Sequence, residues 1–133
     1  MPAKRILVVD DDDSILVLLE KRLQTDGYQV IKASTGKEAV AKAKLFSPAL
    51  VLMDIMLPDV DGPEAFKLLR AQAETSRIPV VFLSGIINEN VDASPTVTID
   101  GEVHPAVAKP IEFGILTEAI EDNILSEPEG SPE

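Results

Sequence analysis

Side chains that could do chemistry follow directly after four short apolar runs of the sequence. These side chains are Asp10 and Asp11, Asp54, Ser84 and Lys109. Short, continuously apolar runs are typical of strands that are buried on both faces of a parallel sheet. The carboxyl ends of parallel strands meet at one edge of the sheet, where ligands bind at the point at which the strand order reverses. We therefore expect the three carboxylates to converge, with the serine and the lysine at the same edge.

Three converging carboxylates require a cation, because like charges raise one another's pKa. The donor set contains only oxygen, and such a set suits Mg²⁺. Lys109 adds a second positive charge to the same edge. The two cations could together offset the negative charge of a transferred phosphoryl group, and this electrostatic effect is most of phosphoryl-transfer catalysis. In this interpretation Asp54 is the nucleophile and forms a carboxyl phosphate.

The elements that must position these residues alternate between apolar runs and segments of helical period, which is typical of a parallel α/β sheet. We expect strands at 6–9, 28–33, 50–53, 78–83 and 105–108, and helices at 14–24, 35–46, 63–73 and 111–125. A right-handed, doubly wound sheet with the strand order 2-1-3-4-5 places the first and third strands side by side. The predicted fold class is therefore an α/β domain with a five-stranded parallel sheet.

The stretch from residue 85 to residue 104 interrupts this alternation. One more helix is expected there, but Pro95, Gly101 and Pro105 disfavour a long one. Residues 96–99 and 102–103 flank an Asp-Gly pair, which favours a β-hairpin. We expect the fourth helix to be shortened to about one turn within 88–93, or to be replaced by this hairpin.

The length and charge of the chain limit the possible functions. Its 133 residues suit one domain, expected over residues 1–125, followed by a disordered acidic tail at 126–133. The net charge of -11 argues against direct binding of nucleic acid. Cysteine is absent, which excludes disulfides and thiolate metal sites. No apolar run approaches the roughly 20 residues of a membrane span, and no signal-peptide pattern precedes the first strand, so we expect a cytoplasmic protein without membrane contact.

Four sequence blocks carry a resemblance to a known family. They are residues 6–12 (ILVVDDD), 52–62 (LMDIMLPDVDG), 81–85 (VFLSG) and the pair Lys109-Pro110. In this order they resemble the receiver domain of response regulators, the CheY-like family with a flavodoxin-like strand order. The similarity covers nearly the whole chain apart from residues 86–105. It implies a single-domain receiver that takes a phosphoryl group from a histidine kinase or phosphotransfer protein and signals to a downstream protein by direct contact.

The resemblance also assigns roles to individual residues. Asp54 is implied to be the phosphoacceptor, assisted by Lys109, which pairs with the phosphoryl group, and by Ser84, which donates to a phosphoryl oxygen. The implied Mg²⁺ ligands are Asp11 directly, Asp10 through a water molecule, Asp54, and the backbone carbonyl of Met56. The Lys109-Pro110 bond is expected to be cis. Such a domain catalyses only its own phosphorylation and dephosphorylation, so we do not expect an enzyme with a separate substrate.

The sequence differs from the family at the positions through which members of the family respond to phosphorylation. Three residues before the lysine, where the family usually carries Tyr or Phe, stands Ala106. The usual turn before that position is replaced by residues 101–105 (GEVHP), and the helix before it is doubtful. The way in which phosphorylation is read out is therefore left open. His104, the only histidine, is expected to be a loop or strand-edge residue.

Other interpretations of the same residues are possible. The run 10–13 could be a solvated charge cluster at the start of a helix, and we expect Asp13 or Ser14 to cap that helix. The pattern Asp10-x-Asp12-x-Ser14 resembles the start of a haloacid-dehalogenase-type phosphatase, although the later acidic pair of such enzymes is missing. A phosphorylation-independent interaction module is a further alternative, against which the complete set of site residues argues.

Overall fold

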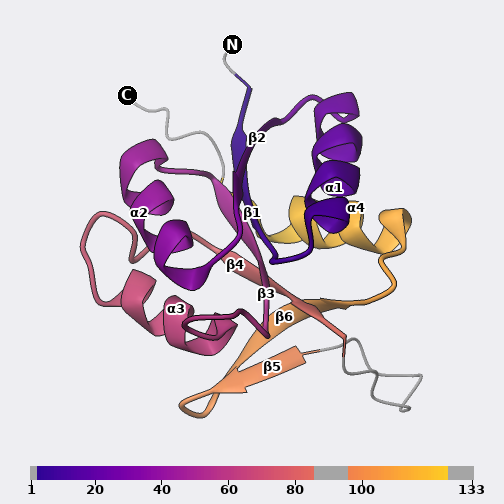
Figure 1. The fold of residues 1–133 in the computed structure, drawn as a ribbon. Helices are drawn as coiled ribbons and strands as arrows, with labels where there is room; N and C mark the ends of the chain where they lie inside the picture. The colour runs from indigo at the N-terminus through magenta and orange to yellow at the C-terminus, as the bar shows by residue number, and fades with distance from the viewer. Residues whose placement is uncertain (1–2, 86–95, 126–133) are drawn as a thin grey trace.

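The computed structural model describes residues 3–85 and 96–125, which form one twisted sheet with helices on both faces (Figure 1). The strands are β1 Arg5–Val9, β2 Gln29–Ala33, β3 Leu50–Asp54, β4 Val80–Ser84, β5 Thr96–Ile99 and β6 Glu102–Ala108. The helices are α1 Asp13–Thr25, α2 Gly36–Phe46, α3 Gly62–Arg70 and α4 Phe113–Asn123. These bounds agree with the predicted elements to within a few residues, apart from the region that contains β5 and β6.

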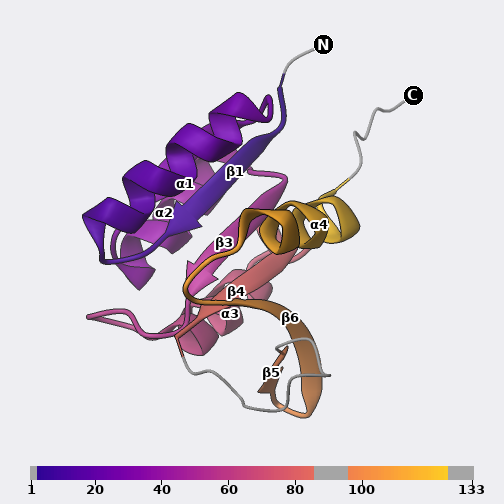
Figure 2. The ribbon, with the colours of Figure 1, turned by 90° about the vertical axis from the view of Figure 1, so that its right-hand side faces the viewer.

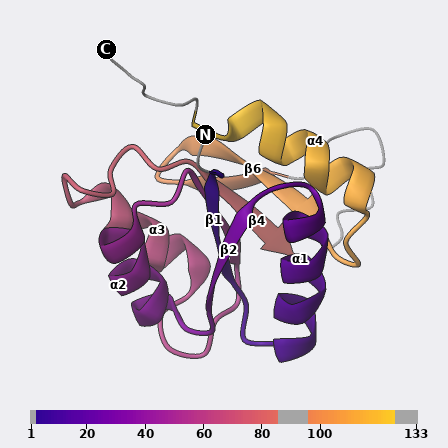
Figure 3. The same ribbon diagram turned by 90° about the horizontal axis from the view of Figure 1, so that it is seen from above.

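The two faces of the sheet are covered by different pairs of helices. Viewed from above, α1 and α4 lie on one side of the sheet and α2 and α3 on the other (Figure 3). The residues of β1 are apolar throughout because both of its faces are covered by helices. Ile6 and Val8 pack with α1 and α4, while Leu7 and Val9 pack with α2 and α3. All four side chains are fully buried, as expected for a strand of a parallel sheet covered on both faces.

The predicted strand order is confirmed. The sheet has the order β2-β1-β3-β4-β6-β5. Each of the first five strands in this order is parallel to its neighbours among those five. In this order β6 takes the place of the predicted fifth strand. The strands β1 and β3 are neighbours, with Val9 opposite Met53, so the chain leaves both strands at the same edge of the sheet.

The region before Lys109 contains the predicted hairpin, and it adds a sixth strand that the five-stranded prediction lacked. Strand β5 pairs antiparallel with β6 around Asp100 and Gly101, whose φ angles of 52° and 85° suit the Asp-Gly turn. The second hairpin strand and the expected strand 105–108 are one continuous strand, seen curving below the sheet in Figure 2. The helical turn predicted within 88–93 and the acidic tail lie outside the described residues.

The hairpin packs onto α3 through an aromatic cluster. The ring of His104 lies 4.5 Å from the ring of Phe66 and 6.4 Å from that of Phe82, measured between centroids. His104, which was expected to be a loop or strand-edge residue, is the third residue of β6 and pairs with Val97 of β5. Ile99 of β5 joins the same core, so the hairpin covers the α3 side of the sheet next to β6.

The four helices in the described part of the chain are short, and the longest of them, α1, has 13 residues. Among the residues that the structure describes, no helix has both the length and the apolar character that a membrane crossing needs.

Candidate functional site

The predicted site residues meet at the carboxyl edge of the sheet. Asp10 follows β1, Asp54 ends β3, Ser84 ends β4 and Lys109 follows β6, and these strands are neighbours in the sheet. A cavity of about 390 Å³ opens there, and its lining includes Asp11, Asp54, Met56, Ser84 and Lys109. The topology therefore brings together the groups that the sequence placed at this edge.

The three carboxylates form a cluster that suits a hard cation. One carboxylate oxygen from each of Asp10, Asp11 and Asp54 lies within 4.8 Å of the other two. Asp10 is fully buried and Asp54 is 7% exposed, while Asp11 lies at the surface. An oxygen-only set that is open on one side suits Mg²⁺, which keeps several waters when proteins bind it. The residues present therefore fit the metal that the family implies.

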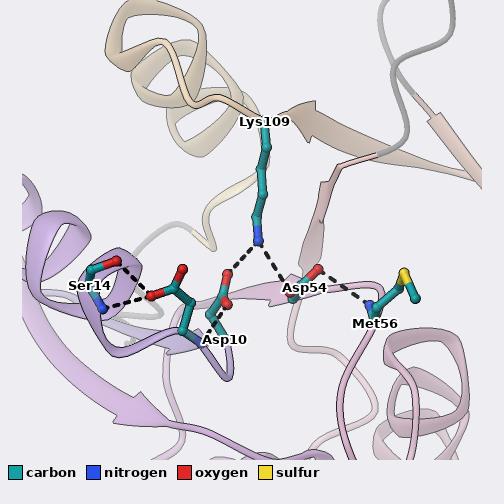
Figure 4. Close-up of polar contacts among 6 residues, drawn as sticks. Asp10, Ser14, Asp54, Met56 and Lys109 are labelled. Atoms are coloured by element: carbon teal, nitrogen blue, oxygen red, sulfur yellow. Dashed lines mark hydrogen bonds and ion pairs between the residues drawn. The ribbon is translucent and has the colours of Figure 1, made fainter.

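Lys109 supplies a positive charge between two of the carboxylates. Its Nζ donates to Asp10 Oδ2 at 2.7 Å and to Asp54 Oδ2 at 3.2 Å (Figure 4). Burial opposes the charge of the lysine, but the hydrogen bonds and charges of the two aspartates outweigh burial and raise the pKa of Lys109. Burial, and then the charge of Asp10, raises the pKa of Asp54, and Lys109 counteracts both effects.

Backbone hydrogen bonds fix the remaining groups of the site. Asp12 N–H donates to Asp10 Oδ1 at 3.0 Å, and Met56 N–H donates to Asp54 Oδ1 at 3.3 Å. The N–H of Lys109 donates to the carbonyl of Ser84 at 2.8 Å, which ties the lysine to the end of β4. Ser84 is buried in the wall of the site. The Lys109-Pro110 bond is cis, as expected.

The aspartate run divides between the site and the start of α1. Asp12 caps this helix, because its carboxylate accepts from Ser14 N–H at 2.9 Å and from Ser14 Oγ at 2.6 Å. The expectation that Asp13 or Ser14 is the cap was wrong, because the helix begins at Asp13 and the cap is the residue before it. Asp10 and Asp11 thus belong to the site, and Asp12 and Asp13 to the helix.

The loop between β3 and α3 carries Met56 and is closed by a glycine. The N–H of Gly62 donates to the carbonyl of Ile55 at 2.7 Å. A Cβ atom at position 62 would lie 2.5 Å from the carbonyl oxygen of Asp54 and 2.9 Å from the Cα of Ile55. Because these contacts are with backbone atoms, only glycine fits where α3 begins against the end of β3.

One residue near the site was missed by the sequence analysis. The carboxylate of Asp59 accepts from Gly36 N–H at 2.8 Å and from Lys37 N–H at 2.9 Å, so it binds the first turn of α2. Asp59 lies 23 residues after Gly36 and 22 residues after Lys37, and no periodic pattern in the sequence links these positions. The only local signal was the position of Asp59 in the loop that follows the phosphoacceptor candidate.

A parallel sheet of this order, with an acidic cluster and a lysine at its carboxyl edge, defines the CheY-like class of α/β domains. The sequence profile of the response regulator receiver domain matches residues 6–121. The chain therefore belongs to the response regulator receiver family of two-component systems.

Curated relatives match this chain over part of their own length. It is 52% identical to the alkaline phosphatase synthesis transcriptional regulatory protein PhoP of Bacillus subtilis over 69 residues, which cover 52% of this chain and 29% of PhoP. It is 42% identical to protein PilH of Pseudomonas aeruginosa over 80 residues, covering 60% of this chain and 66% of PilH. The chain thus spans less than two thirds of either relative.

Solved structures share the fold over nearly the whole chain. The CheY-like receiver domain from Methanospirillum hungatei is 29% identical, with a TM-score of 0.73 over 90% of this chain and 92% of that one. The chemotaxis protein CheY4 of Vibrio cholerae, at 24% identity and a TM-score of 0.77 over 92% and 99% of the two chains, supports the fold alone. The receiver domain of the sensor kinase PA1611 from Pseudomonas aeruginosa has a TM-score of 0.75 at 26% identity, over 90% and 96% of the chains, and carries a magnesium ion in its active site cleft.

Proposed function

We propose that this receiver domain accepts a phosphoryl group on Asp54 in a Mg²⁺-dependent reaction. The observation that carries the proposal is the position of Lys109 Nζ, which lies within hydrogen-bonding distance of both Asp10 and Asp54. A buried carboxylate beside another carboxylate is hard to keep ionised. A fixed ammonium group counteracts this effect and favours the ionised form of Asp54, which is the nucleophile. The same ammonium group can then pair with the incoming phosphoryl oxygens.

The geometry leaves one oxygen of Asp54 suited to attack. Oδ2 is bound to Lys109, while the bond that Oδ1 accepts from the described residues is the 3.3 Å bond from Met56 N–H. A lone pair on Oδ1 attacks the phosphorus atom of a phosphohistidine or of a small acyl phosphate. A new O–P bond forms as the bond to the leaving group breaks, and that group departs with the electron pair. The product is an aspartyl phosphate in the cavity beside Ser84, whose hydroxyl donates to a phosphoryl oxygen.

The metal ligands in this proposal are Asp10, Asp11, Asp54 and the backbone carbonyl of Met56. When bound, Mg²⁺ supplies positive charge that offsets the charge of the transferred phosphoryl group. The protein holds its carboxylates in advance through the hydrogen bonds from Asp12 N–H and Met56 N–H. The neighbour that carries magnesium in its cleft supports the assignment.

The reaction confines the domain to its own phosphorylation and dephosphorylation, so we do not assign it a separate substrate. The phosphoryl donor is a histidine kinase or a phosphotransfer protein, in the cytoplasm, and the output is direct contact with a downstream protein. The net charge of -11 argues against direct contact with nucleic acid. No part of this proposal requires contact with a membrane.

The phosphatase alternative is disfavoured by the burial of Asp10. That reaction needs Asp10 as the nucleophile, but its side chain is fully buried, is bound to Lys109 and to Asp12 N–H, and, unlike Asp54, does not line the cavity. The second acid of the phosphatase pattern, Asp12, is bound to Ser14 at the start of α1. The interaction-module alternative is disfavoured by the complete set of acid, serine and lysine side chains around the cavity.

Incubation with acetyl phosphate and Mg²⁺ tests the proposal. The wild type should gain one phosphoryl group, detected by intact-protein mass spectrometry, and chelation of Mg²⁺ should abolish the gain. Asp54→Ala should gain none under the same conditions. If the wild type is labelled neither by small donors nor by a histidine kinase, the proposal fails and the interaction module remains.

A further inference from the structure

The loop that carries Met56 is attached to a helix that has no other part in the site. Through Asp59, the loop between β3 and α3 binds the N–H groups of Gly36 and Lys37 in the first turn of α2. The helices α2 and α3 lie side by side on the same face of the sheet (Figure 3). The loop therefore spans from the site to the first turn of α2.

The backbones of the loop and of α2 also approach closely at this point. A Cβ atom on Gly36 would lie 2.6 Å from the carbonyl oxygen of Val60 and 3.1 Å from its Cβ. The first residue of α2 therefore has to be glycine for the contact to form. Two neighbouring loop residues, Asp59 and Val60, thus meet the same helix end.

The far end of the loop is fixed as well. Gly62 N–H binds the carbonyl of Ile55, and Asp61 caps α3 by accepting from Glu64 N–H at 2.9 Å. Met56 lies between these attachments, and the residue is 70% exposed. Its own N–H bond to Asp54 Oδ1 and the packing of Ile55 and Leu57 on the core hold the start of the loop, and the attachments of the loop hold the rest of the backbone around its carbonyl.

We propose that Asp59 is a positioning residue for the metal site, which fixes the loop so that the Met56 carbonyl is presented to Mg²⁺. The inference rests on the proposed function, in which this carbonyl is a ligand. A carboxylate at a helix N-terminus is stabilised by the helix dipole and by the free N–H groups of the first turn. In keeping with this, donation from Lys37 N–H, together with that from Gly36, lowers the pKa of Asp59 to about 2.

The experiment is a Mg²⁺ titration of the whole chain, followed by the amide shifts of ¹⁵N-labelled protein with no phosphoryl donor present. Asp59→Ala should bind Mg²⁺ roughly tenfold more weakly than the wild type, the lower end of the effect of losing a residue that orients a ligand. Asp59→Asn should bind with intermediate affinity, because its one amide oxygen can accept from only one of the two N–H groups that the two carboxylate oxygens of Asp59 bind. If Asp59→Ala binds Mg²⁺ as tightly as the wild type, the inference is overturned.

Thr35→Ala is the matched control for damage to α2. Thr35 Oγ1 accepts from Glu38 N–H at 3.0 Å, so the change removes a cap from the same helix end without touching the loop. It should lower the melting temperature while leaving Mg²⁺ affinity unchanged. Equal weakening by Thr35→Ala and Asp59→Ala would show that the helix end alone matters, and would overturn the inference.

Gly36→Ala provides a second variant that leaves the charge intact. Its Cβ should push the loop away at Val60 and weaken Mg²⁺ binding, as Asp59→Ala should.

The Mg²⁺ titration, compared with phosphorylation of the same protein, also distinguishes failure of the proposed function from failure of this inference. If the wild type binds Mg²⁺ but is never phosphorylated, the proposed function fails and the inference stands. If the wild type is phosphorylated and Asp59→Ala binds Mg²⁺ normally, the inference fails and the function stands.

Discussion

Lys109 is the residue on which the electrostatics of the site depend. Asp10 and Asp54 are both buried, and the charge of Asp10 disfavours the ionised form of Asp54 because like charges repel at short range. The ammonium group of Lys109 touches both carboxylates and is itself only partly exposed. Removal of one partner from a buried ion cluster is far more destabilising than removal of a surface pair.

Lys109→Met should therefore lower the free energy of unfolding of the metal-free protein by about 3 kcal/mol, since it leaves two buried carboxylates without a counter-charge. Urea unfolding followed by circular dichroism, with a chelator present, measures the change.

The control for this variant is Lys32→Met. Lys32 pairs with Glu20 at 2.9 Å, but the side chains are 41% and 27% exposed. Loss of such a pair should change the free energy of unfolding by less than about 1 kcal/mol. Equal urea midpoints for Lys32→Met and Lys109→Met would show that the buried cluster does not depend on Lys109.

At the scale of elements, the β3–α3 loop connects the phosphoacceptor candidate to two helices. Gly62→Ala should destabilise the fold by about 2 kcal/mol, because its Cβ would meet the backbone of Asp54 and Ile55. Gly85→Ala is the control, since a Cβ at Gly85 meets no atom of the described residues within 4 Å, and it should change stability by less than about 0.5 kcal/mol. Similar thermal unfolding of the two variants would contradict the close approach at Gly62.

The contact of Asp59 with α2 should appear in the pH dependence of stability. The folded pKa of Asp59 is lowered from its ordinary value of 3.8 to about 2, so its contribution is fully present above 3.8 and is lost as the pH falls toward about 2. The difference in free energy of unfolding between wild type and Asp59→Asn should be constant from about pH 7 to about pH 5. It should then shrink at lower pH, as measured by urea unfolding in a series of buffers. A difference that does not change with pH would contradict the ionic contact.

The hairpin explains how a small residue fits at Ala106. This residue is 8% exposed and packs in the same cluster as Phe82 and Ile99. The hairpin residues Ile99 and His104 occupy the α3 side of the sheet beside it. Phe82 of β4, two residues before Ser84, lies opposite Ala106, and its ring lies 6.4 Å from that of His104, so β4 packs against the hairpin.

At the scale of the whole molecule, Mg²⁺ should stabilise the fold through the site rather than through the net charge of -11. A ligand that binds only the folded state at about ten times its dissociation constant stabilises the protein by about 1.4 kcal/mol. The wild type should show a corresponding rise in melting temperature with Mg²⁺, and Asp11→Asn should show much less. Differential scanning calorimetry at constant ionic strength measures both.

Asp13→Asn is the control for general charge effects. Asp13 belongs to the same acidic run and is exposed like Asp11, but it lies in the first turn of α1 and outside the carboxylate cluster. Its response to Mg²⁺ should match that of the wild type. If the two variants lose the response equally, the stabilisation is non-specific screening of the acidic run.

The sequence predicted the sheet order and the site because both follow from strand ends. Apolar runs mark buried strands, and the residue after each run falls at the carboxyl edge, so Asp54 and Lys109 could be placed together without a structure. The sequence did not predict that the second hairpin strand and the last parallel strand are one strand. Pro105 suggested the start of a new strand, but β6 continues through it. The contact of Asp59 with α2 depends on the packing of two helices, which leaves no periodic signal in the sequence.

The site of phosphorylation tests the central claim most directly. The protein is incubated with acetyl phosphate and Mg²⁺, the acyl phosphate is reduced with borohydride, and the modified residue is located by peptide mass spectrometry. The account predicts that the modification is found at Asp54 and is absent when Mg²⁺ is chelated. Modification at Asp10 or Asp11 with Asp54 unchanged would contradict it.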